Sequence, residues 1–119
     1  MDKINMKNLS FYGYHGAMTE ENVLGQKFVI DCSLLVDLSD AGKSDDVFDT
    51  VHYGEAFDLI KNVVENERYN LIEALAYNII EKLMESFPKI NGVDIEVKKP
   101  QAPVPGIYDY FSVSLSRRR

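Results

Sequence analysis

Two stretches in the middle of the chain repeat apolar residues at intervals of three and four, which is the period of an amphipathic helix. The first stretch begins near His52 and ends around Asn66, and the second covers residues 70–87. Only residues 67–69 separate the two, so no strand fits between them. We therefore expect two consecutive helices rather than the alternating strands and helices of a parallel sheet.

Four other stretches alternate apolar and polar residues, which predicts strands with one buried face. They lie at residues 4–11, 28–38, 93–97 and 111–115. In the first of them the alternation changes phase between Met6 and Leu9, which predicts a β-bulge near Lys7 and Asn8. The order strand, strand, helix, helix, strand, strand predicts an α+β fold. Two hairpins would form one four-stranded antiparallel sheet, with both helices over one face.

The connections between these elements carry no periodic pattern. Residues 17–25 form a loop longer than a tight hairpin needs, and such extra length is often functional. Residues 39–46 form a polar turn, and the proline-rich residues 100–106 precede the last strand. We interpret the closing residues 116–119 as a solvated tail. Because the exposed edges of such a sheet favour pairing with another subunit, we expect an oligomer.

Length, net charge and cysteine content limit the classes of function that the chain can have. A chain of 119 residues suits one modest core, so we expect residues 1–119 to form a single domain. The net charge of -6 argues against nucleic acid or an anionic membrane as a partner. The one cysteine, Cys32, lies on the apolar side of its strand and is expected in the core. No apolar run approaches the roughly 20 residues of a membrane span and no signal peptide is present, so we expect a cytoplasmic protein.

Glu73 is an acid at the edge of the apolar face of the second helix, near its start. One interpretation is a variant of the capping box, with Asn70 as the N-cap and Glu73 as the third helical residue. The other is a receptor for a flat polar ligand that presents two adjacent N–H donors to the carboxylate. The two interpretations are compatible.

Several common catalytic motifs do not occur. Gly13 and Gly16 are not followed by the Gly-Lys-Ser/Thr sequence that cradles phosphates. His15, His52 and Cys32 fall on separate elements without the local spacing of zinc ligands, so we expect no metal site. No G-x-S-x-G marks a serine nucleophile. The groups that remain are polar residues at loop edges, namely Glu21, Tyr53, Glu73 and Lys99.

Four motifs together resemble one family in their order and spacing. They are FYGYHGA at 11–17 with EN at 21–22 and GQ at 25–26, DTVHYG at 49–54, NLIEALA at 70–76, and KPQAPVPG at 99–106. The family is that of the dihydroneopterin aldolases of folate biosynthesis, and the resemblance covers nearly the whole chain. The bulky pair Tyr110 and Phe111 departs from the small residues expected there, which bears on the packing of the last strand.

The resemblance implies a tunnelling fold, in which subunits pair their sheet edges into a barrel. Such proteins are commonly octamers of two stacked rings, with active sites between neighbouring subunits. The implied reaction cleaves 7,8-dihydroneopterin into 6-hydroxymethyl-7,8-dihydropterin and glycolaldehyde without metal, cofactor or lysine Schiff base. This chemistry is reasonable because the dihydropterin ring already contains an imine that can accept the electrons of the breaking C–C bond.

The resemblance also assigns roles by position. Glu73 would bind the pterin amino group and ring N–H in a paired, charge-assisted hydrogen bond. Lys99 would be the principal proton-transfer residue, and Tyr53 would share the proton relay. Glu21 would bind the side-chain hydroxyls and position Lys99 or a water. Backbone groups would hold the edge of the ring at Ile72 and Val51.

Three rival functions differ in what they require. An epimerase acting on dihydroneopterin triphosphate would need a cationic patch, for which Lys27, Lys98 and Arg117 are the candidates. A non-catalytic pterin- or purine-binding module would not need both Lys99 and Tyr53. A zinc-dependent relative such as a pyruvoyl-tetrahydropterin synthase is disfavoured, because the two histidines of this chain cannot form a histidine triad.

Overall fold

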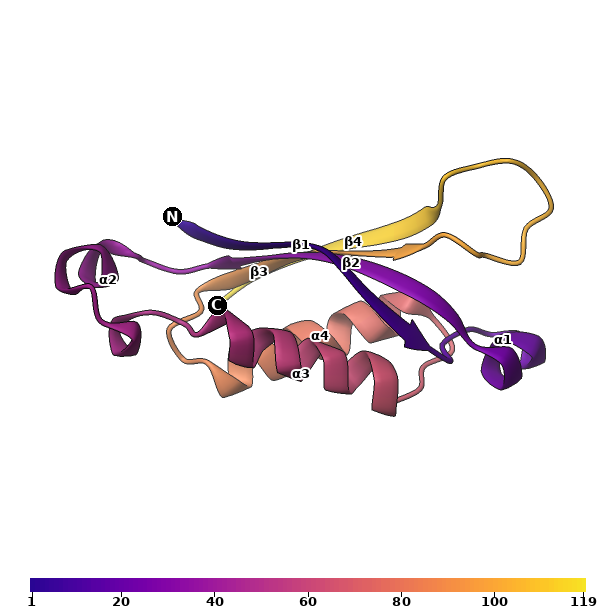
Figure 1. Ribbon diagram of the computed structural model, residues 1–119, viewed down its shortest axis with the longest axis horizontal. Helices are drawn as coiled ribbons and strands as arrows, with labels where there is room; N and C mark the ends of the chain where they lie inside the picture. The colour runs from indigo at the N-terminus through magenta and orange to yellow at the C-terminus, as the bar shows by residue number, and fades with distance from the viewer.

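The computed structural model describes residues 1–119 and contains one four-stranded antiparallel sheet. The strands are β1 (Lys3–Gly13), β2 (Gln26–Leu35), β3 (Gly92–Lys99) and β4 (Phe111–Arg118), and they lie in the sheet in chain order. Two long helices, α3 (Tyr53–Asn66) and α4 (Ile72–Ser86), cover one face of the sheet (Figure 1). The predicted α+β fold is confirmed.

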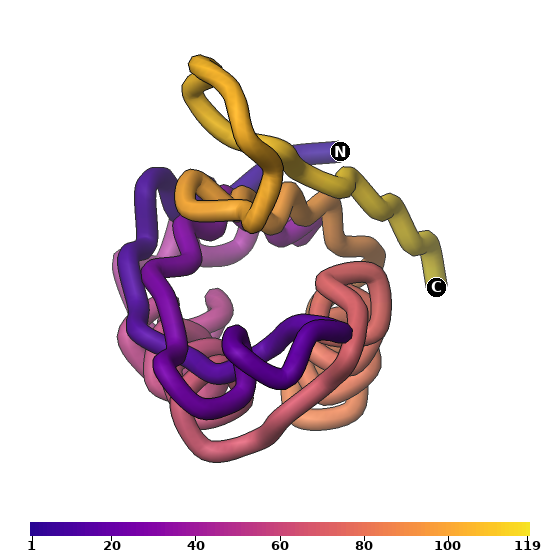
Figure 2. The backbone as a smooth tube through the Cα atoms, turned by 90° about the vertical axis from the view of Figure 1, so that its right-hand side faces the viewer, coloured from indigo at the N-terminus to yellow at the C-terminus, as the bar shows by residue number.

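The core lies between the sheet and the two helices. Figure 2 looks along the helices and shows the sheet on one side, with α3 and α4 next to each other on the other. The buried helix residues recur at the predicted intervals, and they are Ala56, Ile60, Val63, Val64, Leu75, Ala76, Ile79, Ile80 and Leu83. Cys32 is fully buried among them, as predicted, and burial raises the pKa of its thiol to about 12. Cys32 is therefore an uncharged core residue.

The predicted bulge in β1 is confirmed. Met6 pairs with Cys32, but the next pair is Leu9 with Ile30, so two β1 residues lie opposite one β2 residue. Asn8 adopts a positive φ of 55°, and its amide donates a 2.8 Å hydrogen bond to Asp31 Oδ1. The bulge restores the apolar face of β1 to the core side after the change of phase.

Two connections contain short helices that the sequence patterns did not predict. The supposed loop at 17–25 contains α1 (Thr19–Leu24), and the polar turn at 39–46 contains α2 (Ser39–Ser44), followed by the 3-10 turn η1 (Val47–Asp49). Six residues are too few to display a helical period. α1 ends at Gly25, with a φ of 69°, and α2 ends at Asp45, with a φ of 57°.

The predicted start of α4 is wrong by two residues. The helix begins at Ile72, its N-cap is Leu71, and no side chain caps it. Asn70 Oδ1 instead accepts a 2.9 Å hydrogen bond from Arg68 Nη2. Glu73 is therefore the second helical residue, and the capping-box interpretation with Asn70 does not hold.

The C-terminal arginines do not form the predicted solvated tail. Arg117 and Arg118 continue β4, and Arg118 Nη1 lies 2.9 Å from Asp94 Oδ1. Arg119 reaches the end of α4, where its Nη2 donates to the Met84 carbonyl over 2.6 Å and its Nε to the Ile90 carbonyl over 2.8 Å. The last carbonyls of a helix have no donor within the helix, and the Arg119 guanidinium donates to one of them, that of Met84.

We expect Arg119→Ala to lower the free energy of unfolding by about 1 kcal/mol, because a charged donor is removed from carbonyls at a helix end. Urea unfolding at fixed protein concentration measures this. Lys61→Ala is the control, since Lys61 is exposed on α3 and makes no ion pair. Equal stabilities of the two variants would show that the Arg119 contacts contribute nothing.

Candidate active site

Glu21 and Lys99 form a mostly buried ion pair where α1 meets the end of β3. The side chains are 8% and 14% exposed, and Lys99 Nζ pairs with Glu21 Oε2. The same oxygen accepts a 2.8 Å hydrogen bond from Gln26 Nε2, and the Met18 amide donates to Oε1 over 3.3 Å. Donors from three segments of the chain therefore fix the carboxylate of Glu21.

The electrostatics of Glu21 favour its charged form. Burial alone would raise the pKa of Glu21, but hydrogen bonds from Lys99, Gln26 and the Met18 amide outweigh it and hold the pKa below its usual range. At neutral pH the carboxylate of Glu21 is therefore ionised, and Lys99 is its ion-pair partner.

Gly16 makes room for this carboxylate. A Cβ at Gly16 would collide with the carboxyl group of Glu21, and the Gly16 φ of 154° also suits glycine. The Gly16 amide donates a 3.0 Å hydrogen bond to the Tyr69 carbonyl, which ties this loop to the connection between α3 and α4. The role of Gly16 is therefore to let the Glu21 side chain approach closely. It is not a glycine of a phosphate-binding loop, which the sequence excludes.

His15 joins the same two segments from inside the core. Its ring is fully buried, and its Nδ1 accepts a 3.1 Å hydrogen bond from the Tyr69 amide. Nε2 must then carry the proton, which it donates to the Val64 carbonyl over 2.7 Å. Burial lowers the pKa of His15, and the bond to Val64 only partly opposes this, so the ring is neutral.

Glu73 and Ile72 lie in the first turn of α4, close in sequence to this junction. Glu73 is exposed and its carboxylate makes no ion pair or hydrogen bond within the chain. Because Tyr69 is bonded to both His15 and Gly16, the start of α4 lies at the same end of the molecule as Glu21 and Lys99 (Figure 1). This end therefore offers an acid–base pair and a free carboxylate.

A family model for dihydroneopterin aldolase matches residues 4–116. The chain belongs to the dihydroneopterin aldolase family. A dihydroneopterin aldolase of Streptococcus pyogenes serotype M18 (strain MGAS8232) is 46% identical over 119 residues, which is 100% of both chains. The crystal structure of E. coli dihydroneopterin aldolase in complex with neopterin is similar with a TM-score of 0.90 and 30% identity, over 98% of this chain and 99% of that one. The structure of a FolB protein from Vibrio cholerae O1 has a TM-score of 0.94 and 31% identity, over 100% of this chain and 98% of that one.

The dihydroneopterin aldolase resemblance selects six residues, and two of them lie away from the Glu21–Lys99 pair. Tyr53 opens α3 and is 66% exposed, and Val51 just before it is buried. The C-terminal end of α3, at Val64, is the end that contacts His15. With 14 residues, α3 is about 20 Å long, so Tyr53 lies roughly that far from the junction. Within one chain, the six selected residues therefore fall into two separate parts.

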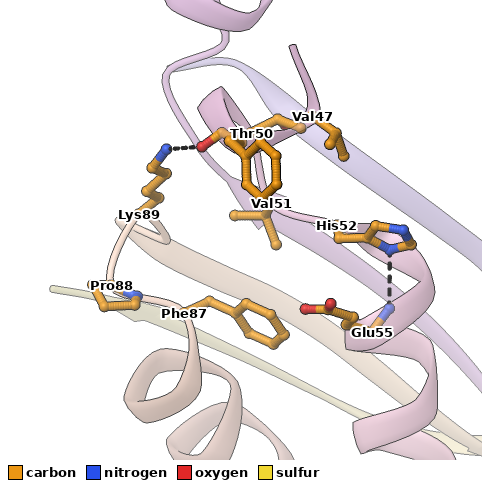
Figure 3. Close-up of a pocket in the computed structure, with 9 residues that line it drawn as sticks. Val47, Thr50, Val51, His52, Glu55, Phe87, Pro88 and Lys89 are labelled. Atoms are coloured by element: carbon orange, nitrogen blue, oxygen red, sulfur yellow. Dashed lines mark hydrogen bonds between the residues drawn. The ribbon is translucent and has the colours of Figure 1, made fainter.

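The part at Val51 adjoins a cavity of about 340 Å³ between the start of α3 and the end of α4 (Figure 3). His52 Nδ1 accepts a 3.3 Å hydrogen bond from the Glu55 amide and so caps α3, while Lys89 Nζ donates to the Phe48 carbonyl over 2.6 Å. None of Glu21, Glu73 or Lys99 lines this cavity. The Glu21–Lys99 pair lies at the other end of the molecule.

Gln26 is a residue of this site that the sequence patterns did not select. It is 5% exposed, and while its Nε2 donates to Glu21, its Oε1 is buried without a donor. The sequence did carry one signal for Gln26: it is a polar residue on the core-facing side of β2, where Phe28 and Ile30 follow.

Two of the three candidates for the cationic patch that a triphosphate would need have other partners. Lys98 points to the other face of β3, where Asp31 binds it at 2.8 Å and raises its pKa. Arg117 lies over the ring of Tyr77, and Lys27 is exposed. No helix combines the length and the apolar character needed to cross a membrane.

We expect the stability of the chain to fall on acidification below about pH 6.5, the unfolded pKa of histidine. Because the folded pKa of His15 is lowered, the unfolded chain binds more protons between the two pKa values, and the free energy of unfolding decreases there by up to about 1.4 kcal/mol per pH unit. Urea unfolding between pH 7.5 and 5.5 measures the slope.

His52→Gln, at the chain's other histidine, should keep this slope, whereas His15→Gln should flatten it. NMR titration of the wild-type imidazoles gives a second test that needs no variant. A His15 ring that titrates at or above pH 6.5 would contradict the expectation.

Proposed function

We propose that the chain is a cytoplasmic aldehyde-lyase that cleaves 7,8-dihydroneopterin into 6-hydroxymethyl-7,8-dihydropterin and glycolaldehyde. Its membership of the dihydroneopterin aldolase family supports this, as does its similarity to the E. coli enzyme solved with neopterin. The single observation that carries the proposal is the buried pair of Glu21 and Lys99, because a retro-aldol step needs a positioned proton carrier and little else.

The bond that breaks joins the first and second carbons of the side chain, counted from the ring. The proposed step removes the proton of the hydroxyl on the second carbon. As the C–C bond breaks, this carbon becomes the aldehyde of glycolaldehyde, and the bonding electrons move into the ring imine. The resulting enol intermediate takes a proton on carbon to give the hydroxymethyl product. The proton removed from the hydroxyl is matched by the proton added to carbon, so the reaction needs no further reagent.

Lys99 is the residue we assign to these proton transfers. Its Nζ pairs with Glu21 and its side chain is 14% exposed, so a bound substrate side chain would exclude most of the remaining water. Glu21 would hold Lys99 in place and accept a hydrogen bond from a substrate hydroxyl or a water. The free Oε1 of Gln26 is a further acceptor at this position.

Glu73 is the residue we assign to the pterin ring. Its free carboxylate can accept two parallel hydrogen bonds from an amino group and the adjacent ring N–H. The amides of Ile72 and Glu73, the first two residues of α4, have no intrahelical acceptor and can hold the edge of the ring.

Tyr53 and Val51 would complete the site from a neighbouring copy of the chain. Each chain has both parts, about one helix length apart, so a ring of copies could bring the Tyr53 end of one chain to the Lys99 end of the next. The unpaired edges of β1 and β4 are the surfaces we propose for this pairing, with a homo-octamer as the assembly.

The first test is an anaerobic incubation of the purified chain with 7,8-dihydroneopterin and EDTA, with both products followed by chromatography. We expect them in equal amounts despite the chelator. Lys99→Ala should then lower kcat by about 10²- to 10⁴-fold, as removal of a proton-transfer group does, with neopterin affinity kept within a few-fold.

Glu73→Ala should instead weaken neopterin binding by at least about tenfold, since a charge-assisted hydrogen-bond pair is lost. Glu81→Ala is the matched control, an exposed acid about two turns further along α4 that makes no ion pair or hydrogen bond within the chain. Unchanged binding and turnover in both site variants would refute these assignments, and turnover that depends on a metal would refute the mechanism.

Mixed oligomers test the sharing of sites between subunits. Lys99→Ala and Tyr53→Ala chains, each inactive alone, should regain about a quarter of wild-type activity when refolded together in equal amounts, because one site in four would draw both intact residues from different chains. Activity is compared with that of each variant refolded alone. No recovery from a mixture shown to contain both chains would place Tyr53 and Lys99 of each site within one subunit.

A further inference from the structure

Arg68 connects three segments that surround the candidate active site. Its Nε donates a 2.9 Å hydrogen bond to Asn22 Oδ1 on α1. Its Nη2 donates to the Gly16 carbonyl over 3.2 Å and to Asn70 Oδ1 over 2.9 Å. One guanidinium therefore holds the loop before α1, α1 itself and the segment that leads into α4.

The partners of Arg68 lie next to the groups that matter for the proposed reaction. Asn22 directly follows Glu21, and Gly16 is the residue against which the Glu21 carboxylate closes. Asn70 lies three positions before Glu73. The bonds of Arg68 thus join the part of the site that moves protons to the part that would hold the ring.

The helix α1 has few other attachments. Glu21 is its one buried residue, while Val23 and Leu24 are each 70% exposed. The buried bonds of His15 and Gly16 fasten the preceding loop to Tyr69, but they do not reach α1. The Tyr12 hydroxyl donates to the Leu24 carbonyl and so ties α1 to β1, whereas the bond from Arg68 to Asn22 ties α1 to the connection between α3 and α4.

We infer that Arg68 is a positioning residue for the reaction, which fixes the placement of the Glu21–Lys99 pair relative to Glu73. This rests on the proposed function. The ring bound at Glu73 must present its side chain to Lys99, and small displacements of reacting groups reduce rates strongly. A lysine at this position has no planar fork and cannot serve three acceptors in the same way.

The test compares Arg68→Ala and Arg68→Lys with Lys61→Ala in the assembled protein. We expect both Arg68 variants to lose about tenfold in kcat while neopterin binding stays within twofold, because the ring site is intact and the proton carrier is displaced. Methylguanidinium should restore part of the rate of Arg68→Ala, and methylammonium at the same concentration should not. Hydrogen exchange should increase at the α1 amides and remain unchanged in α3 and α4.

A double-mutant cycle with Asn22→Ala separates positioning from general weakening. If Arg68 acts through Asn22, the double variant loses little more in kcat than Arg68→Ala alone. Additive losses, or a loss that methylguanidinium does not reverse, would overturn the inference. A wild-type chain without turnover would refute the proposed function, whereas wild-type turnover with an unchanged kcat in Arg68→Ala would refute only the role of Arg68.

Discussion

The neutral imidazole of His15 is the contact on which the arrangement of the candidate site depends. It receives the Tyr69 amide on one nitrogen and donates to the Val64 carbonyl from the other, so it links the end of β1 to both sides of the turn between the helices. The two backbone groups lie at a helix end and in a loop, where partners from regular secondary structure are lacking. A charged ring could not accept from Tyr69, and the chain keeps the ring neutral by burying it.

The site is built outward from this junction. Gly16 follows His15, and its missing side chain leaves the space that the Glu21 carboxylate occupies. Glu21 in turn meets Lys99 at the end of β3, which is 78 positions later in the sequence. The candidate chemistry thus depends on a short run of residues with strong local constraints, placed against the ends of the regular elements.

The long elements could be predicted from the sequence because their burial follows a period. The alternation from Phe28 to Leu34 and the helical spacing in α4 both report one buried face, and even the β1 bulge left a change of phase between Met6 and Leu9. Elements of six residues leave no such record, so α1 and α2 were missed. The cap predicted at Asn70 does not form, because a nearby guanidinium, rather than a helix amide, bonds to its side chain.

The candidate site could be located only by resemblance, and the structure explains why. Glu21 and Glu73 look like ordinary surface acids in the sequence, yet the first is buried against a lysine and the second is free. Arg68 acts on a group that is near in space but distant in sequence, since Arg68 and Asn22 are 46 positions apart. No local pattern reports such pairs. The wide separation of Tyr53 from Lys99 likewise becomes visible only when the length of α3 is known.

The alternation of β3 decides which of two neighbouring lysines serves the site. Lys98 turns to the outer face and binds Asp31, while Lys99 turns inward to Glu21. A slip of one residue would exchange the two side chains without altering charge or composition. What prevents it is the burial of Val93, Ile95 and Val97, which would all be turned out to water. The choice of lysine at the candidate site is therefore set by three aliphatic residues of the core, and a single insertion upstream in this strand would place Lys98 where Lys99 now lies.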